Sequence, residues 1–140
     1  MLPTKVYKKR QIIYNEGDPA REIYIIMSGL IKIVKNIKKN PTDVAILGKS
    51  SILGEVAMFR GDRHSATAVV EDDAEIAIIN KESVDEQLKE VPKWIQTLIR
   101  SLCDRLHDSN ERISMLEKAE SAEKLKVLKK DKQDVKEEEA

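Results

Sequence analysis

The feature that most constrains this sequence is a change of pattern near Asn80. Before it, short apolar runs rich in β-branched residues alternate with turn-forming clusters such as residues 15–19. Such runs at regular intervals are typical of a small antiparallel barrel or roll. After Pro92 no glycine or proline interrupts the chain, which predicts a long helix. We therefore expect a mainly β unit followed by C-terminal helices.

Strands are expected where apolar runs stand between turn-forming residues: 12–14, 23–27, 30–34, 44–47, 67–70 and 75–79. The dipeptide Ser28-Gly29 is expected to end one strand. Residues 40–43, Asn-Pro-Thr-Asp, are expected to form a turn, and residues 71–74 to separate the last two strands.

Two helices are expected after Asn80. The first ends near Pro92, and Ser83 and Glu86 have the spacing of a capping box at its start. The second carries a seam of residues spaced alternately by four and three: Ile95, Ile99, Leu102, Leu106, Ser109, Ile113 and Leu116. The first half of this seam is expected to pack on its own barrel, and the second half against a partner helix.

The domain organisation follows from these patterns. Residues 1–92 are expected to form the barrel and a short helix, and residues 93–118 a long dimerisation helix. Residues 119–140, where the seam decays into charged residues, are expected to form a frayed tail. The expected assembly is a homodimer.

Composition excludes several classes of function. The 25 basic and 25 acidic residues cancel, which argues against an overall affinity for nucleic acid or anionic membranes. A single cysteine, Cys103, excludes an intramolecular disulfide and a multi-cysteine metal site. The start of the chain has no apolar signal-peptide core, so we expect a cytoplasmic protein. The only histidines, His64 and His107, suggest no nucleophile-histidine arrangement, and we do not expect an enzyme.

Residues 48–68 are the stretch that can carry ligand chemistry. Gly54 allows a ligand to approach the backbone closely. Residues 55–59 can form one or two helical turns, whose free N–H groups, including those of Val56 and Ala57, would face an anion. Glu55 is an acceptor suited to ribose hydroxyl groups.

Phosphate donors follow the short helix. Arg63, His64 and Ser65 supply side-chain donors suited to a phosphate group. Together with Glu55 they make a constellation that fits a nucleotide. An ordinary surface loop remains the alternative, because Gly-Glu and Arg-His pairs also occur by chance.

The motifs resemble those of the cyclic nucleotide-binding domain family. Gly17-Asp18 followed by residues 24–29, Tyr-Ile-Ile-Met-Ser-Gly, looks like the opening of that domain. Residues 53–58, Leu-Gly-Glu-Val-Ala-Met, resemble the start of its phosphate-binding cassette, and residues 65–68, Ser-Ala-Thr-Ala, resemble its end. The resemblance runs from about Tyr7 to Leu116, and the helical end is most similar to the bacterial catabolite-activator branch.

This resemblance implies an eight-stranded jelly-roll barrel, a double-stranded β-helix, that holds a cyclic nucleotide. The expected ligand is cAMP, with cGMP or no nucleotide as the alternatives. Glu55 falls on the position that binds the ribose 2′-hydroxyl. The backbone at Gly54 and Ala66, with Ser65, falls on phosphate-contacting positions. Ser109 and Asn110 fall where the activator branch contacts adenine, although a polar residue at Ser109 can also fix the register of a helix pair.

The sequence departs from the family pattern at several positions. His64 replaces the phosphate-binding arginine, and Arg63 stands where proline or a variable residue is usual. Ser50 and Leu53 replace glycine and phenylalanine. The chain ends without the helix-turn-helix of the activator branch, so we expect a stand-alone sensor module or a fragment.

Two functions remain open at this stage. The first is a dimeric sensor that binds a cyclic nucleotide and signals through an unidentified effector protein, without direct DNA binding or membrane association. The alternative is a structural or interaction module of the same fold that no longer binds a nucleotide, as the replacement at His64 would allow.

Overall fold

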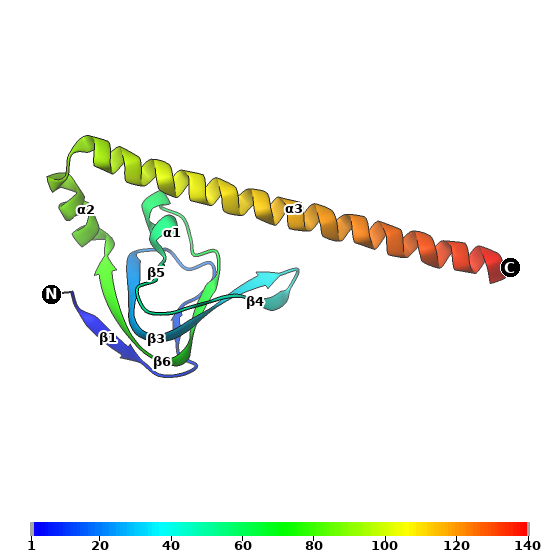
Figure 1. Cartoon of the computed structure of the whole chain (residues 1–140), viewed down its shortest axis with the longest axis horizontal. Coiled ribbons are helices and arrows are strands. Elements are labelled where there is room, and N and C mark those ends of the chain that lie inside the picture. The colour runs from blue at the N-terminus through cyan, green and yellow to red at the C-terminus, as the bar shows by residue number, and fades with distance from the viewer. Residues whose placement is uncertain (1, 140) are drawn as a thin grey trace. The chain divides into compact units, whose positions relative to one another are not determined.

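The computed structural model describes residues 2–139 and confirms the expected fold class, a jelly-roll-like β unit followed by a long helix (Figure 1). Contacts divide the chain into two units, one ending at Asp104 and one beginning at Arg105. The elements are β1 (Thr4–Tyr7), β2 (Ile12–Tyr14), β3 (Glu22–Ile37), β4 (Asn40–Leu47), β5 (Ile52–Leu53), α1 (Glu55–Arg60), β6 (Thr67–Asn80), α2 (Lys81–Glu90) and α3 (Lys93–Glu139).

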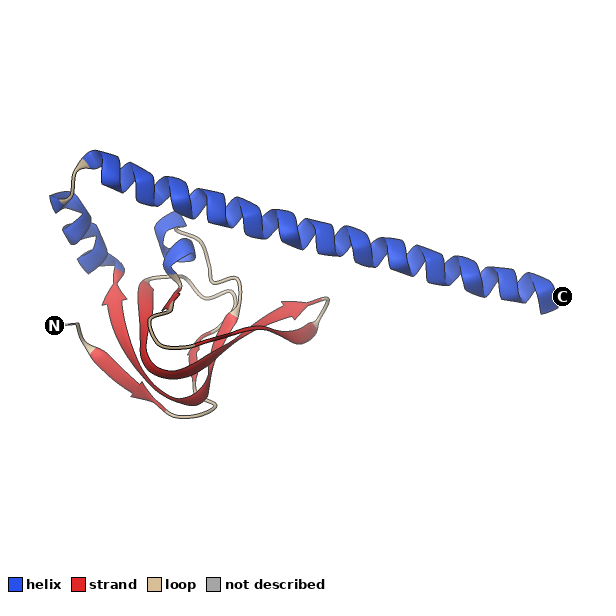
Figure 2. Ribbon diagram, in the orientation of Figure 1, coloured by secondary structure: helices blue, strands red, loops and turns tan. Residues whose placement is uncertain are grey.

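Two long strands, β3 and β6, form the centre of the β unit (Figure 2). The strand order is β1-β6-β3-β4, while β2 also pairs with β6 and β5 with β3, and every pair is antiparallel. Register shifts between Ile26 and Ile31 bend β3 against β6. The described residues form six strands and not the eight that the resemblance implies. β3 spans the strands expected at residues 23–27 and 30–34, and β6 spans those expected at residues 67–70 and 75–79.

Gly29 lies inside β3, so the expected strand end at Ser28-Gly29 is wrong. Its φ of 90° lies in the left-handed region, and a Cβ atom there would overlap the Asp73 carbonyl oxygen and lie 2.6 Å from Ala74 Cα. The glycine therefore allows β3 to cross β6 closely. Residues 71–74, expected to separate two strands, belong to β6 at this crossing.

The turn expected at residues 40–43 is also wrong, because these residues belong to β4. The chain reverses at Lys38 and Lys39, whose φ values are 50° and 66°, and Ile37 pairs with Asn40. A two-residue hairpin loop with positive φ at both positions matches the twist of the flanking strands. Pro41 is tolerated in β4 because this strand lies at the edge of the sheet.

Ser50 occupies the turn before β5 with a φ of 74°, a conformation that costs an L-residue about 1–2 kcal/mol. Its backbone N–H donates to the Ile26 carbonyl oxygen at 2.8 Å, so the turn cannot relax without losing that bond. We expect Ser50→Gly to raise the unfolding free energy by about 0.5–1 kcal/mol, since the gain exceeds the added entropy of the unfolded chain. Urea unfolding measures this, and Ser51→Gly is the neighbouring control. A loss of stability in Ser50→Gly contradicts the expectation.

Helix α2 begins differently from the expectation. Asn80, and not Ser83, caps the helix, because the Asn80 side-chain oxygen accepts the Ser83 N–H at 2.8 Å. The Gln96 amide of α3 donates to the Leu88 and Val91 carbonyl oxygens at 2.6 and 3.1 Å, which ties the end of α2 to α3.

Helix α3 reaches Glu139, so the tail predicted to fray is helical in the structure. Its composition allows this, because the tail holds no glycine or proline and Glu120 pairs with Lys124 one turn on, at 3.5 Å. Ile95 and Ile99 are half-buried, whereas Leu102, the next residue of the seam, is 48% exposed, so the packing of the first half of the seam on the barrel stays a prediction. No helix among the described residues is long and apolar enough to cross a membrane.

Candidate functional site

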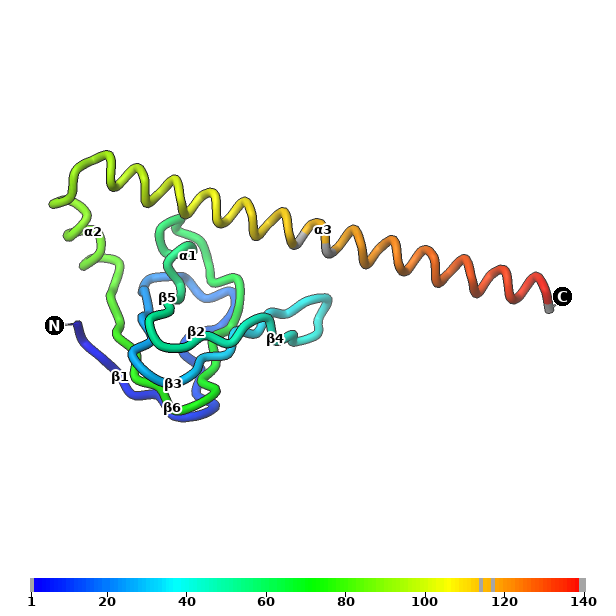
Figure 3. The backbone as a smooth tube through the Cα atoms, viewed as in Figure 1, coloured from blue at the N-terminus to red at the C-terminus, as the bar shows by residue number. Residues whose placement is uncertain are grey.

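The segment between β5 and β6 is a turn, a short helix and a second turn (Figure 3). Gly54, with a φ of 80°, precedes α1, and Gly61, with a φ of 70°, ends it. Met58 is 2% exposed and anchors α1 in the smaller of two apolar clusters. The short helix expected over residues 55–59 is thereby confirmed.

The turn that contains Gly17 and Asp18 holds the loop after α1 in place. The Gly17 N–H donates to the His64 carbonyl oxygen at 2.8 Å, and the His64 N–H donates to the Asp18 carbonyl oxygen at 2.9 Å. A third bond joins the Ala20 N–H to the Asp62 carbonyl oxygen at 3.3 Å. The Gly17-Asp18 motif and the candidate phosphate segment, far apart in sequence, are thus paired through their backbones.

The His64 side chain is buried, with 5% of its surface exposed. Its ring stacks on Tyr14 with centroids 3.7 Å apart, and a Cβ atom on Gly54 would lie 3.1 Å from His64 Cε1. Burial lowers the pKa of His64 below its usual value, and the Asp18 charge only partly opposes this. At neutral pH the imidazole is therefore uncharged, and it cannot supply the permanent charge of an arginine.

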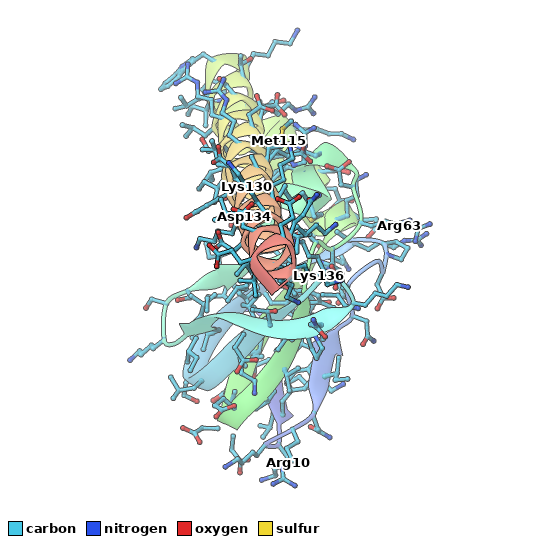
Figure 4. The ribbon with its side chains drawn as sticks, turned by 90° about the vertical axis from the view of Figure 1, so that its right-hand side faces the viewer. Arg10, Arg63, Met115, Lys130, Asp134 and Lys136 are labelled. Carbon is cyan, nitrogen blue, oxygen red and sulfur yellow. The ribbon has the colours of Figure 1, made fainter. Side chains whose placement is uncertain are left out.

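Arg63 and the two residues after His64 differ in whether their hydrogen-bond donors already have an acceptor. The exposed Arg63 side chain extends away from the barrel (Figure 4), and its Nη1 donates to the Gly17 carbonyl oxygen at 2.8 Å. The backbone N–H groups of Ser65 and Ala66 have no acceptor among the described residues. The loop therefore offers two uncommitted backbone donors, while its arginine is already bonded.

Glu55 is the first residue of α1 and is half-buried. Burial raises the pKa of its carboxyl group, and its own backbone N–H partly opposes the rise. No cationic side chain among residues 2–139 pairs with it. Its charge also contributes to raising the pKa of Tyr14 to about 12, after burial of that phenol. A partly buried carboxylate without a cation is a strong acceptor for hydroxyl groups.

The structure brings most of the predicted site residues into one segment. Gly54 lies against His64, and Glu55 begins the helix that continues with the half-buried Val56 and Ala57. Tyr14 was not predicted, because no local pattern indicates that a residue of β2 stacks on a histidine fifty positions away. The predicted base-contacting residues 109 and 110 are exposed on α3 beyond Asp104, and their role stays a prediction.

The lowered pKa of His64 leads to a prediction of how the unfolding free energy depends on pH. Below pH 6.5 the unfolded chain binds a proton at this histidine more readily than the folded chain. The contribution of neutral His64 is therefore complete above pH 6.5 and is lost as the pH falls from that value through the lower pKa of the folded state. We expect His64→Gln to flatten this part of a urea-unfolding profile measured between about pH 5 and 8. Equal slopes in His64→Gln and the unmodified chain contradict the assignment.

The chain matches the family model described as cyclic nucleotide-binding domain over residues 4–91. It is 32% identical over 111 residues to the anaerobic regulatory protein of Bacillus subtilis, covering 72% of this chain and 46% of the relative. The cyclic AMP receptor protein of Thermus thermophilus is 22% identical over 113 residues, covering 80% and 52%. The chain thus spans about half the length of the curated relatives it matches.

Solved structures agree with this match. The cAMP-bound form of an EAL enzyme superposes with a TM-score of 0.69 at 32% identity, covering 81% of this chain and 30% of that chain. The catabolite activator protein of Thermus thermophilus superposes with a TM-score of 0.68 at 22% identity, covering 82% and 55%, and supports the fold alone. A family match over more than half of the chain settles its membership. This chain belongs to the cyclic nucleotide-binding domain family.

Proposed function

We propose that this chain is a cytoplasmic sensor module that binds a cyclic nucleotide, with cAMP preferred over cGMP, and that it is a binding rather than a catalytic protein. The observation that carries the proposal is the group of uncommitted polar atoms around Gly54. Within the part of the chain that the structure describes, the backbone N–H groups of Ser65 and Ala66 have no acceptor and the Glu55 carboxylate has no cation. Donors for a phosphate therefore lie in the same segment as an acceptor for a ribose.

Each residue has a distinct role in this proposal. Gly54 keeps the backbone accessible, and the N–H groups of Val56 and Ala57 lie in the first turn of α1, where helical N–H groups lack intrahelical partners. Glu55 accepts the ribose hydroxyl. The backbone at residues 65–66 holds the phosphate, with His64 as one neutral donor and Arg63 available after release from Gly17. Residues 109 and 110 of α3 contact the base.

A specific observation favours the alternative, an interaction module that has lost nucleotide binding. His64 is buried against Tyr14 and uncharged, and Arg63 is bonded to Gly17. Without a charge-assisted contact the phosphate loses about 2 kcal/mol, or about thirtyfold in affinity. The two proposed functions therefore differ in whether backbone N–H donors alone are sufficient to bind the phosphate group.

Calorimetric titration with cAMP and then cGMP, at low and moderate salt, decides between them. We expect saturable micromolar binding of cAMP, and about thirtyfold tighter binding in His64→Arg, which restores a charged donor. Arg63→Gln is the matched control, with a small effect if the arginine stays bonded to Gly17. The absence of heat and of thermal stabilisation at millimolar ligand rejects the sensor and favours the interaction module.

The dimer is part of this proposal. Leu106, Ile113 and Leu116 are 50%, 55% and 70% exposed on α3, which leaves apolar surface for a partner helix. We propose that two copies pair through these residues and that an effector protein recognises the result. The double substitution of Leu106 and Ile113 by lysine is expected to halve the mass in solution. An unchanged mass rejects this interface.

A further inference from the structure

A second pocket, of about 540 Å³, lies where α1, α2 and the beginning of α3 meet. Its apolar lining comes from Met58 and Phe59 of α1 and from Leu88 of α2. None of the residues assigned to nucleotide binding lines it. Its volume is sufficient for a small organic ligand, and the other five lining residues, Lys81, Asp85, Lys89, Gln96 and Arg100, are polar or charged.

The charges around this pocket are unbalanced. Lys81 and Lys89 of α2 and Arg100 of α3 line it, against one carboxylate, that of Asp85. Among the described side chains, none of these three cations lies within ion-pair distance of a carboxylate. Arg60 provides the contrast, because its guanidinium is bonded to Asp62 at 3.0 Å and to Asp104 at 2.6 Å. The pocket therefore has the charge to hold an anion, and its cations are not used to stabilise the fold.

Hydrogen bonds at both ends of α2 hold the frame of the pocket. The Gln96 amide bonds to the Leu88 and Val91 carbonyl oxygens, and this fixes the turn between α2 and α3. At the other end of α2, the Lys81 N–H donates to the Arg21 carbonyl oxygen at 2.9 Å. A preformed frame lowers the entropy that binding costs.

We propose that this pocket is a second binding site, for a small organic dianion with a flat apolar body. The anionic group binds between Lys89 and Arg100, and the flat body packs on Phe59 and Leu88. Such a ligand uses both the unpaired cations and the apolar lining, whereas a simple inorganic anion uses only the former.

Helix α1 couples this site to the cassette. Met58 and Phe59 line the pocket, and Glu55 begins the same six-residue helix. The Met58 N–H also donates to the Gly54 carbonyl oxygen at 3.0 Å. A dianion that packs on Phe59 therefore changes the affinity for cyclic nucleotide, and by linkage the nucleotide changes the affinity for the dianion. This coupling rests on the proposed function, whereas the binding itself does not.

The test is calorimetric titration of the full chain with 1-naphthyl phosphate, a flat aromatic dianion. We expect saturable binding that weakens at least about tenfold in Lys89→Glu and in Arg100→Glu, since each reversal removes a charge-assisted contact. Lys126→Glu is the matched control and is expected to bind like the unmodified chain. Because the residues at 89 and 100 are exposed, both variants are expected to fold, and circular dichroism checks this.

Several results overturn the proposal. One is no saturation at millimolar probe, and another is equal affinity for inorganic phosphate, which would remove the role of the apolar lining. Loss of probe binding in Glu55→Ala would place the probe in the cassette. With saturating 1-naphthyl phosphate, the cAMP affinity is expected to change at least about twofold, and an unchanged affinity overturns the coupling. If cAMP does not bind at all, the proposed function fails, while the charge-reversal variants still decide the second site.

Discussion

Replacing Gly29 with alanine is expected to remove about 4 kcal/mol or more of unfolding free energy, a large part of what a domain of this size has. The new Cβ atom would overlap the Asp73 carbonyl oxygen and come within 2.6 Å of Ala74 Cα. Both are backbone atoms of β6, held by the pairing of Ser28 with Glu75 and of Leu30 with Asp72. They cannot move away without breaking the contact between the two central strands. Urea unfolding followed by circular dichroism measures the loss.

Gly17→Ala is a matched control for this prediction. Gly17 has a φ of 89°, nearly that of Gly29, but a Cβ atom there meets nothing within 4 Å. Gly17→Ala is expected to lower the unfolding free energy only by the cost of the left-handed conformation, about 1–2 kcal/mol. The difference between the two variants isolates the close crossing of β3 and β6. Equal losses in both would show that backbone conformation, and not the crossing, makes glycine necessary at Gly29.

Replacing Glu55 with alanine is expected to weaken cyclic nucleotide binding by about thirty- to a hundredfold, as one charged hydrogen bond to the ribose is lost. The fold is expected to tolerate the change. Burial raises the pKa of this carboxyl group, so the ionised side chain is held in the folded state at a cost. Removing it therefore leaves the chain at least as resistant to unfolding at neutral pH. Calorimetry and thermal unfolding of the same sample separate the two effects.

Two controls sharpen the test of Glu55. Glu55→Gln keeps the volume and one carbonyl acceptor, so an intermediate loss of affinity is expected. Glu82→Ala removes a carboxylate from the exposed face of α2 and is expected to leave the affinity unchanged. Full nucleotide affinity in Glu55→Ala would reject the ribose assignment, and with it the arrangement proposed for the cassette.

Several elements of the fold could be predicted because their signals are local. The short helix at residues 55–60 stands between two glycines that adopt left-handed conformations, and the switch from strands to helices follows Asn80. The sequence predicts breaks within β3 and β6 that the structure does not have, because turn signals are also purely local. Ser28-Gly29 is a turn signal by composition, yet the strand continues through it because β6 crosses there.

For the candidate site, residue types indicated the right segment but not its electrostatics. The chemistry of Gly54, Glu55 and Ser65 could be inferred from their side chains and spacing. The state of His64 could not, because it depends on a stack with Tyr14 and on burial by strands remote in sequence. The hydrogen bond from Arg63 to the Gly17 carbonyl oxygen could not be predicted either, since it joins residues 46 positions apart.

The sequence predicts the change from strands to helices near Asn80, the short helix after Gly54 and the apolar seam of α3, because each depends on neighbours within a few positions. Which turn signals end a strand, which helix faces are buried and which of the described cations pair with a carboxylate follow from the three-dimensional fold. These depend on burial and on contacts between distant segments, as the unpaired Lys89 and the neutral His64 both show. Charge and exposure at a site are set by packing, and packing is a property of the whole fold.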